Sequence, residues 1–215
     1  MTAPALRGGI RPVLFPRSVA VVGASDRTAE SAADLQQVLD GGVPTWFVNP
    51  NRPSVLGREC FASLTALPEQ PECAYLLVGH ARAASAFADA IAAGVRAVVL
   101  PGLGAEAGVE GRAVAASIGA SAAEHDVAVV GPNCMGIATP GGVSLWLGTV
   151  GGPDAFVPGH VSCVAHSGSV GEAFLACGPR VGFRTVVSAG SEVLSARPRA
   201  PLVNALSRQS PVRQT

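Results

Sequence analysis

A chain of 215 residues with 48% hydrophobic residues can bury one complete core and is too apolar to be intrinsically disordered. The formal net charge is zero and no residue is lysine, which excludes Schiff-base chemistry and a lysine-containing phosphate-binding loop. No apolar run reaches the roughly 20 residues that a membrane span requires, and the N-terminus lacks the pattern of a signal peptide, so we expect a cytoplasmic protein.

Between residues 18 and 130, short apolar runs alternate with stretches of helical periodicity. The runs are rich in valine and end at glycine, proline or asparagine, which is typical of buried strands followed by tight turns. Such an alternation predicts an α/β fold with a doubly wound parallel sheet. The predicted strands are 18–22, 45–48, 74–78, 97–100 and 127–130, and the predicted helices are 30–39, 82–93 and about 110–124.

The residues that follow these strands form the candidate binding face. Because βαβ crossovers are almost always right-handed, the five strands should run in one direction, with their carboxyl ends at one edge of the sheet. Ligands of open α/β sheets bind at that edge. The residues expected there are Gly23, Asn49, Gly79, Gly102 and Gly131.

The turn after the first strand, Gly23-Ala24-Ser25-Asp26-Arg27, stands where nucleotide-binding folds carry their phosphate-binding turn. N–H groups at the start of the following helix favour an anion, and the Ser25 hydroxyl could add a donor. Only one glycine of the G-x-G-x-x-G pattern is present, so a plain tight turn is an equal alternative.

The second strand ends in Asn49-Pro50-Asn51-Arg52. NAD-binding folds usually place an Asp or Glu here to hold the ribose hydroxyls. An arginine beside two amides suits a phosphorylated ribose better, so this turn favours NADP or coenzyme A (CoA) over NAD. The alternative is a polar turn with a solvated arginine.

The loop Gly131-Pro132-Asn133-Cys134-Met135-Gly136 brings backbone, an amide and a thiol to the same edge. Cys134 could act as a nucleophile, but no histidine is close in sequence to serve as its base, so we favour a structural role. The five cysteines of the chain are odd in number and contain no C-x-x-C pair. Neither a disulfide framework nor a metal site is therefore indicated.

After Gly136 the pattern loosens, and a second α/β unit then begins, with strands at 161–164 and 184–188 and a helix at 168–177. One such unit cannot cover both faces of a sheet, so this second domain looks incomplete. The serines at the start of its helix could bind a phosphoryl group together with the helix N–H groups, or Ser167 could simply cap the helix.

Four motifs, in order and at matching strand ends, resemble the NDP-forming acyl-CoA synthetases and the alpha subunit of succinyl-CoA synthetase. They are 15–25 (FPRSVAVVGAS), 48–52 (VNPNR) with Gly57, 131–136 (GPNCMG) and 166–168 (HSG). The resemblance implies a Rossmann-like CoA-binding domain followed by the start of a second, flavodoxin-like α/β domain. The implied division is an N-terminal extension at 1–13, a CoA-binding domain at 14–150, a partial ligase domain at 151–192 and an atypical tail, which we expect to be mobile, at 193–215.

By the same resemblance, Gly23, Ala24 and Ser25 would contact the phosphates of CoA, and Asn133 the pantetheine arm. The other implied residues are Asn49, Pro50, Asn51 and Arg52 at the adenosine end, Gly79 and His80 beside the cofactor, Gly102 in a glycine-rich turn over 101–106, and Ser167, Gly168 and Ser169 facing the phosphohistidine of the family.

Two departures from the family pattern matter. Ser31 stands where the family has a glycine early in the first helix. The phosphorylated histidine of the family has no counterpart among His80, His125, His160 and His166, and ATP-grasp sequence is missing. We therefore expect no catalytic residue in this chain and a partner chain that carries ATP-grasp and ligase domains.

Three functions remain open. The first, which we predict, is a CoA-binding module of an acyl-CoA synthetase that is inactive alone, with no nucleic-acid or membrane partner and with oligomerisation left open. The second is a stand-alone CoA or nucleotide sensor. The third is an NADP-dependent oxidoreductase, which the missing fingerprint glycines disfavour.

Overall fold

The computed structural model describes residues 10–103, 107–148, 157–177 and 180–190. Its first sheet has seven strands in the order β3-β4-β2-β1-β5-β6-β7. All neighbouring strands pair in parallel except β3 and β4, which are antiparallel. The strands are β1 (Val19–Val22), β2 (Thr45–Val48), β3 (Ser54–Val55), β4 (Arg58–Phe61), β5 (Cys73–Leu76), β6 (Ala97–Val99) and β7 (Ala128–Val130).

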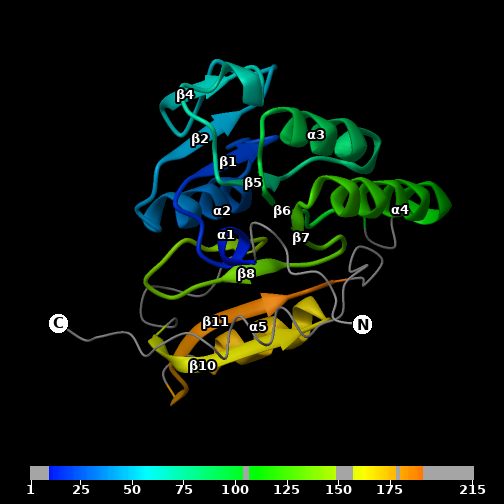
Figure 1. The fold of residues 1–215 in the computed structure, drawn as a ribbon. Helices are drawn as coiled ribbons and strands as arrows, with labels where there is room; N and C mark the ends of the chain where they lie inside the picture. The colour runs from blue at the N-terminus through cyan, green and yellow to red at the C-terminus, as the bar shows by residue number, and fades with distance from the viewer. Residues whose placement is uncertain (1–9, 104–106, 149–156, 178–179, 191–215) are drawn as a thin grey trace.

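Helices cover both faces of this sheet, which confirms the predicted doubly wound architecture (Figure 1). Val19 and Val21 of β1 pack in one core with helices α1 and α2, whereas Ala20 and Val22 pack in the other with α3 and α4. This alternation is expected for a strand that is buried on both faces. The helices are α1 (Arg11–Leu14), α2 (Ala29–Asp40), α3 (His80–Ala92) and α4 (Gly108–His125), and a 3-10 turn, η1, spans Leu64–Ala66.

The capping residues of α2 and α3 explain how accurately the first residue of each helix was predicted. Thr28 caps α2 by accepting a hydrogen bond from the Ser31 N–H, and the Ser31 hydroxyl accepts one from the Thr28 N–H, both at 3.2 Å. This reciprocal capping fixes the start of α2 one residue from the predicted place. Helix α3 begins at His80 rather than at residue 82, because its N-cap is Gly79, which offers no side-chain signal.

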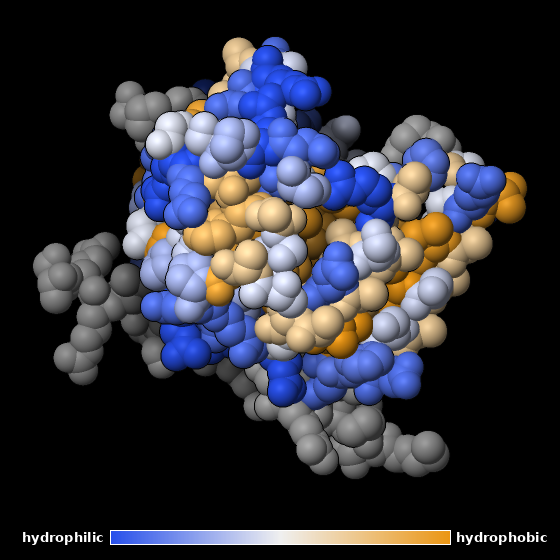
Figure 2. Space-filling model, turned by 90° about the horizontal axis from the view of Figure 1, so that it is seen from above, coloured by the Kyte–Doolittle hydropathy of each residue, from blue (hydrophilic) through white to orange (hydrophobic). Residues whose placement is uncertain are grey.

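Helix α4 owes its length to composition more than to an amphipathic pattern. Alanine, the residue with the highest helix propensity, recurs on both its buried and its exposed sides. Seen from above, the side of the molecule that carries α4 therefore mixes apolar and polar residues (Figure 2), and Val109 in its first turn is 74% exposed. Among the described residues, no helix combines the length and the apolar character that membrane crossing requires.

A second sheet has the order β10-β11-β8-β9 and carries helix α5 on one side. The strand-helix-strand unit predicted near the end of the chain is thus completed by two short strands that precede it. Strand β11 pairs in parallel with β10 and antiparallel with β8, which in turn pairs with β9. These elements are β8 (Gly136–Ala138), β9 (Leu145–Trp146), β10 (Pro158–Ala165), α5 (Gly168–Ala176) and β11 (Phe183–Ser188).

The two sheets share a core. Ile137 and Val187 pack with the first sheet and α2, whereas Ala138 and Val186 face α5 from the other side of the second sheet. The domain division expected at residue 150 stays a prediction. The second sheet spans this position, because β8 and β9 precede residue 150 and β10 and β11 follow it. The tail at 193–215 lies outside the described residues.

Candidate functional site

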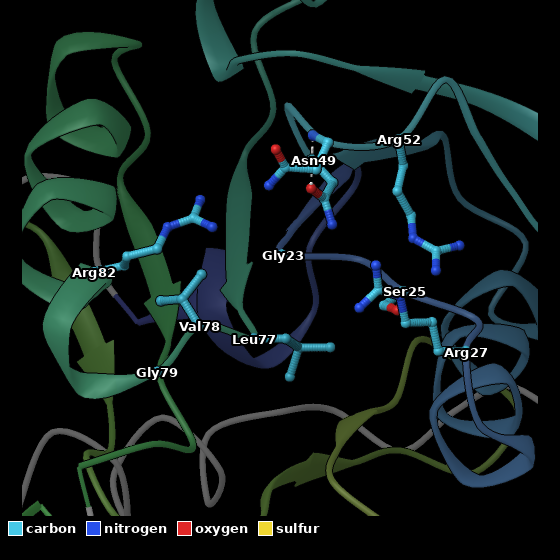
Figure 3. Close-up of a pocket in the computed structure, with 10 residues that line it drawn as sticks. Gly23, Ser25, Arg27, Asn49, Arg52, Leu77, Val78, Gly79 and Arg82 are labelled. Carbon is cyan, nitrogen blue, oxygen red and sulfur yellow. Dashed lines mark hydrogen bonds between the residues drawn. The ribbon is translucent and has the colours of Figure 1, made fainter.

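The carboxyl ends of the parallel strands meet at one edge, as the sequence predicted, and a pocket of about 240 Å³ opens there (Figure 3). The pocket lies between β1 and β5, where the strand order reverses, and this is the usual ligand position in open α/β sheets. Six predicted residues line it: Gly23, Ser25, Asn49, Asn51, Arg52 and Gly79. The prediction missed four others: Arg27, Leu77, Val78 and Arg82.

Gly23 shapes the floor of the pocket. Its φ is +85°, and a Cβ atom there would lie 2.2 Å from the carbonyl oxygen of Leu77. The Gly23 N–H donates to the Val48 carbonyl and the Leu77 N–H to the Val22 carbonyl, each at 2.8 Å. Glycine is therefore required for β1 to end this close to β2 and β5.

Asn49 joins the two turns that border the pocket. Its Nδ2 donates to the Ala24 carbonyl at 2.9 Å, and its Oδ1 accepts from the Asn51 N–H at 3.0 Å. Both ends of the amide are thus engaged within the protein. The geometry gives Asn49 a positioning role, and its predicted contact with a ligand remains a prediction.

Arg52 is held by Asp26, which lies in the turn after β1 and is not among the predicted site residues. Their side chains form an ion pair of 2.6 Å between Nη1 and Oδ1, and Asp26 Oδ2 accepts the Leu56 N–H at 2.9 Å. The hydrogen bond from Leu56 and the charge of Arg52 lower the pKa of Asp26. Arg52 is consequently oriented before any ligand arrives.

The other predicted contacts lie on or beside this edge. Ala24 is buried in the β1–α2 turn, and His80 is the exposed first residue of α3. Further along, the Asn133 N–H donates to the Gly102 carbonyl at 2.8 Å, which joins the ends of β6 and β7. Pro50 lies in the Asn49 turn, and 104–106 of the predicted glycine-rich turn fall outside the described residues.

Cys134 points into the core rather than toward the edge. It is 5% exposed, and its sulfur lies 3.5 Å from the Leu100 carbonyl oxygen. Burial raises the pKa of the thiol to about 12. A thiol in this state is a poor nucleophile, so the geometry favours the structural role.

Alkylation distinguishes the two roles. At pH 8, iodoacetamide should modify the exposed Cys177 readily and Cys134 at least about 100-fold more slowly, because a buried thiol with a raised pKa supplies little thiolate. Mass spectrometry of chymotryptic peptides measures both rates in one sample, because the aromatic residues between the two cysteines let chymotrypsin separate them, whereas no lysine or arginine lies between them for trypsin to cleave. The same reaction in urea is the control, in which the two cysteines should react alike. Equal rates in the folded protein would restore Cys134 as a candidate nucleophile.

The serines at the start of α5 lie beside the loop at 131–136. Ser167 accepts a hydrogen bond from the Val170 N–H, and a Cβ atom on Gly168 would lie 2.3 Å from Cγ of Met135. A Cβ atom on Gly190 would lie 2.2 Å from the Pro132 carbonyl oxygen. The fold thus brings together two predicted regions, the Asn133 loop and the segment Ser167-Gly168-Ser169, which are distant in sequence.

Comparison with known proteins identifies relatives of this architecture. A family model described as a CoA binding domain matches residues 17–140. Trans-feruloyl-CoA synthase FCS1 of an unknown prokaryotic organism is 35% identical over 130 residues, which cover 58% of this chain and 18% of that protein. Acetate–CoA ligase [ADP-forming] I of Archaeoglobus fulgidus is 27% identical over 186 residues, which cover 85% of this chain and 27% of that protein.

Among solved structures, the dinucleotide forming acetyl-coenzyme A synthetase 1 of Ca. Korarchaeum cryptofilum in complex with phosphate and ADP matches with a TM-score of 0.80 at 22% identity. The match covers 94% of this chain and 43% of that one. At this identity the likeness shows the fold alone, and it extends through both sheets described above. The chain spans less than half the length of each of these relatives.

Proposed function

The chain belongs to the CoA-binding domain family, and on that premise we propose that it is the CoA-binding module of an NDP-forming acyl-CoA ligase. The observation that carries this proposal is that the matched segment, 17–140, contains the pocket and the loop at 131–136. The relatives that match most of this chain are ADP-forming CoA ligases. The sequence of the turn at 49–52, which favours a ligand with a phosphorylated ribose, agrees with this assignment.

The order of the site residues along the edge suggests how CoA lies. The phosphates fit the turn at Gly23 and Ser25, and the adenosine end fits the turn at 49–52. From there the pantetheine arm extends past Gly102 to Asn133. Its thiol then reaches the junction with α5, where Ser167 and Ser169 stand at the start of the helix. In the order of the sheet, this path runs from β2 through β1, β5 and β6 to β7.

We assign binding to this chain and phosphoryl transfer to a partner chain with ATP-grasp and ligase domains. All four histidines of the sequence lie in the described residues, and all four are exposed. They belong to separate parts of the fold: His80 starts α3, His125 ends α4, His160 lies in β10, and His166 precedes α5. Their arrangement supports no shared catalytic centre, which favours a module that binds CoA and relies on a partner for turnover.

Calorimetric titration tests the proposal. CoA should bind with one site per chain, and NADP and ATP should bind at least about tenfold more weakly, because neither has a pantetheine arm to follow the edge. Binding of NADP without binding of CoA would instead support an oxidoreductase.

The role of Asn133 is tested by the same titration. Its φ is +57°, so Asn133→Ala would add about 1 kcal/mol of backbone strain, whereas Asn133→Gly keeps the conformation and removes only the amide. We expect Asn133→Gly to weaken CoA binding about fivefold, since it deletes one hydrogen bond to the ligand. If its affinity for CoA equals that of the unmodified chain, Asn133 makes no contact with the arm.

A further inference from the structure

We infer that Ser188, the last residue of β11, is a positioning residue for the proposed ligand: its hydroxyl holds the loop at 131–136 in the place where Asn133 would meet the pantetheine arm. This inference rests on the proposed function. It makes that function more specific, because it gives the second sheet a part in forming a site that otherwise belongs to the first. Ser188 is not among the predicted site residues and would not touch the ligand itself.

The Ser188 hydroxyl is a buried acceptor for the backbone of the loop. Ser188 is fully buried, and its Oγ accepts a hydrogen bond from the Met135 N–H at 3.1 Å. In the antiparallel ladder between β11 and β8, Ser188 pairs with Gly136, the first residue of β8. Met135 precedes this ladder, so the regular strand pairing ends before it reaches the Met135 N–H. The hydroxyl supplies the acceptor there and thus attaches the loop itself to β11.

The opposite side of the loop is attached to the first sheet. The Asn133 N–H donates to the Gly102 carbonyl at 2.8 Å, two residues before the bond between Met135 and Ser188. Asn133 has a left-handed backbone conformation, with φ +57°. A short segment that is bonded to a different sheet at each end has little freedom to rotate. The two bonds together therefore set the direction in which the Asn133 side chain leaves the backbone.

The residues that follow Ser188 pack against the same loop. A Cβ atom on Gly190 would lie 2.6 Å from the Asn133 carbonyl oxygen. The Ala189 N–H donates to the Ala165 carbonyl of β10 at 2.7 Å, which fixes this segment in turn. These contacts are made by backbone atoms and by the Ser188 hydroxyl, and not by the side chains that form the small core beneath α5. The loop is therefore supported by a fixed part of the second sheet.

Removal of the hydroxyl should displace the loop. In Ser188→Ala, the Met135 N–H loses its acceptor where water has little access, and an unpaired backbone donor there costs free energy. The loop lies at the edge of the sheet, so it can recover a partner by turning its backbone toward water. That movement takes Asn133 away from the proposed path of the arm, and CoA then binds without this contact.

Titration of CoA into Ser188→Ala tests this role. We expect the affinity for CoA to fall about fivefold, as in Asn133→Gly, because each variant loses one hydrogen bond to the ligand. Ser144→Ala is the matched control: Ser144 is also buried, and its Oγ accepts the Thr139 N–H at 2.9 Å, outside the loop. Its CoA affinity should change less than about twofold, although urea unfolding should show similar losses of stability in both serine variants. Unchanged CoA affinity in Ser188→Ala, or an equal loss in Ser144→Ala, would overturn the inference.

A double variant separates positioning from a general loss of stability. If Ser188 acts through Asn133, adding Ser188→Ala to Asn133→Gly should weaken CoA binding less than about twofold further, because the amide to be positioned is already gone. A full fivefold further loss would mean that the hydroxyl affects the ligand by another route, and the positioning role would be refuted.

Amide hydrogen exchange of the full chain tests the attachment of the loop without a ligand. The Asn133 and Met135 amides should exchange at least about tenfold faster in Ser188→Ala than in the unmodified chain, and less than about twofold faster in Ser144→Ala. Unchanged exchange in Ser188→Ala would contradict the inference even if CoA binds. If exchange is faster but the unmodified chain does not bind CoA, Ser188 holds the loop and it is the proposed function that fails.

Discussion

Gly23→Ala should destabilise the protein by about 3 kcal/mol or more and abolish CoA binding at ligand concentrations that saturate the unmodified chain. The new Cβ would lie 2.2 Å from the oxygen and 2.9 Å from the carbon of the Leu77 carbonyl. Both are backbone atoms of the neighbouring strand, so the contact can be relieved only by moving β1 away from β5. That movement would also separate the walls of the pocket, because Gly23 and Leu77 both line it.

Gly42→Ala provides the matched control. Gly42 also has a positive φ, +71°, but nothing lies within 4 Å of the position that its Cβ would occupy. The free energy of unfolding of this variant should fall only by the strain of a left-handed backbone conformation, about 1 kcal/mol. The variant should bind CoA as the unmodified chain does. Urea unfolding and calorimetry measure both variants. Equal losses of stability would show that backbone conformation, not the close approach of β1 to β5, explains the glycine at position 23.

The sequence predicted the central strands because they carry a strong local signal. Five runs of apolar, largely β-branched residues ended at turn residues, and the strands β1, β2, β5, β6 and β7 occur within two residues of the predicted bounds. Strands β3, β4, β8 and β9 were missed. They contain two to four residues each, and β3 and β4 are half exposed. Such short strands are specified by the neighbours with which they pair, and a sequence window does not contain those neighbours.

The pocket was predicted less completely than the sheet for a similar reason. Glycine and serine after β1 indicated a phosphate-binding turn by themselves. Arg82 gives no such signal, since it stands at the start of the helix predicted at 82–93, and only the fold shows that this turn of α3 borders the pocket. Asp26 lies in the turn at 23–27, but its role is to orient Arg52, which is 26 residues away in the sequence. Residues whose function requires a distant partner are those that local patterns miss.

Trp146→Ala should be the most destabilising of the core substitutions, at about 3–5 kcal/mol. Trp146 is 1% exposed and packs with Ala138, Leu175 and Phe183 in the small core beneath α5. Its ring lies 2.7 Å from the position that a Cβ on Gly171 would occupy, so helix and ring are in close contact. Because this core has so few buried side chains, they cannot move to fill the cavity that the indole leaves. The protein should therefore lose the full stability that an unfilled cavity costs.

The same substitution tests whether the two sheets unfold together. The Trp146 carbonyl accepts a hydrogen bond from Gln37 of α2 at 3.3 Å, and the Gly148 N–H donates to Asp34 of the same helix at 3.0 Å. Helix α2 also starts directly after the turn that borders the pocket. Because these contacts and the shared core link the second sheet to the first, we expect Trp146→Ala to lower the midpoint of a single urea transition rather than to split it.

Two measurements and one control complete this test. Circular dichroism reports both sheets, and the fluorescence of Trp46, which lies half-buried in β2, reports the first sheet alone in the Trp146→Ala chain. If the two signals change at the same urea concentration, the two sheets unfold as one cooperative unit. If the fluorescence changes only at a higher urea concentration, the first sheet is stable without the second. Trp46→Ala should cost less than Trp146→Ala because its side chain leaves solvent only in part on folding. In the folded Trp146→Ala chain, CoA affinity should change less than about threefold, since none of the residues that line the pocket belongs to the second sheet or to α5.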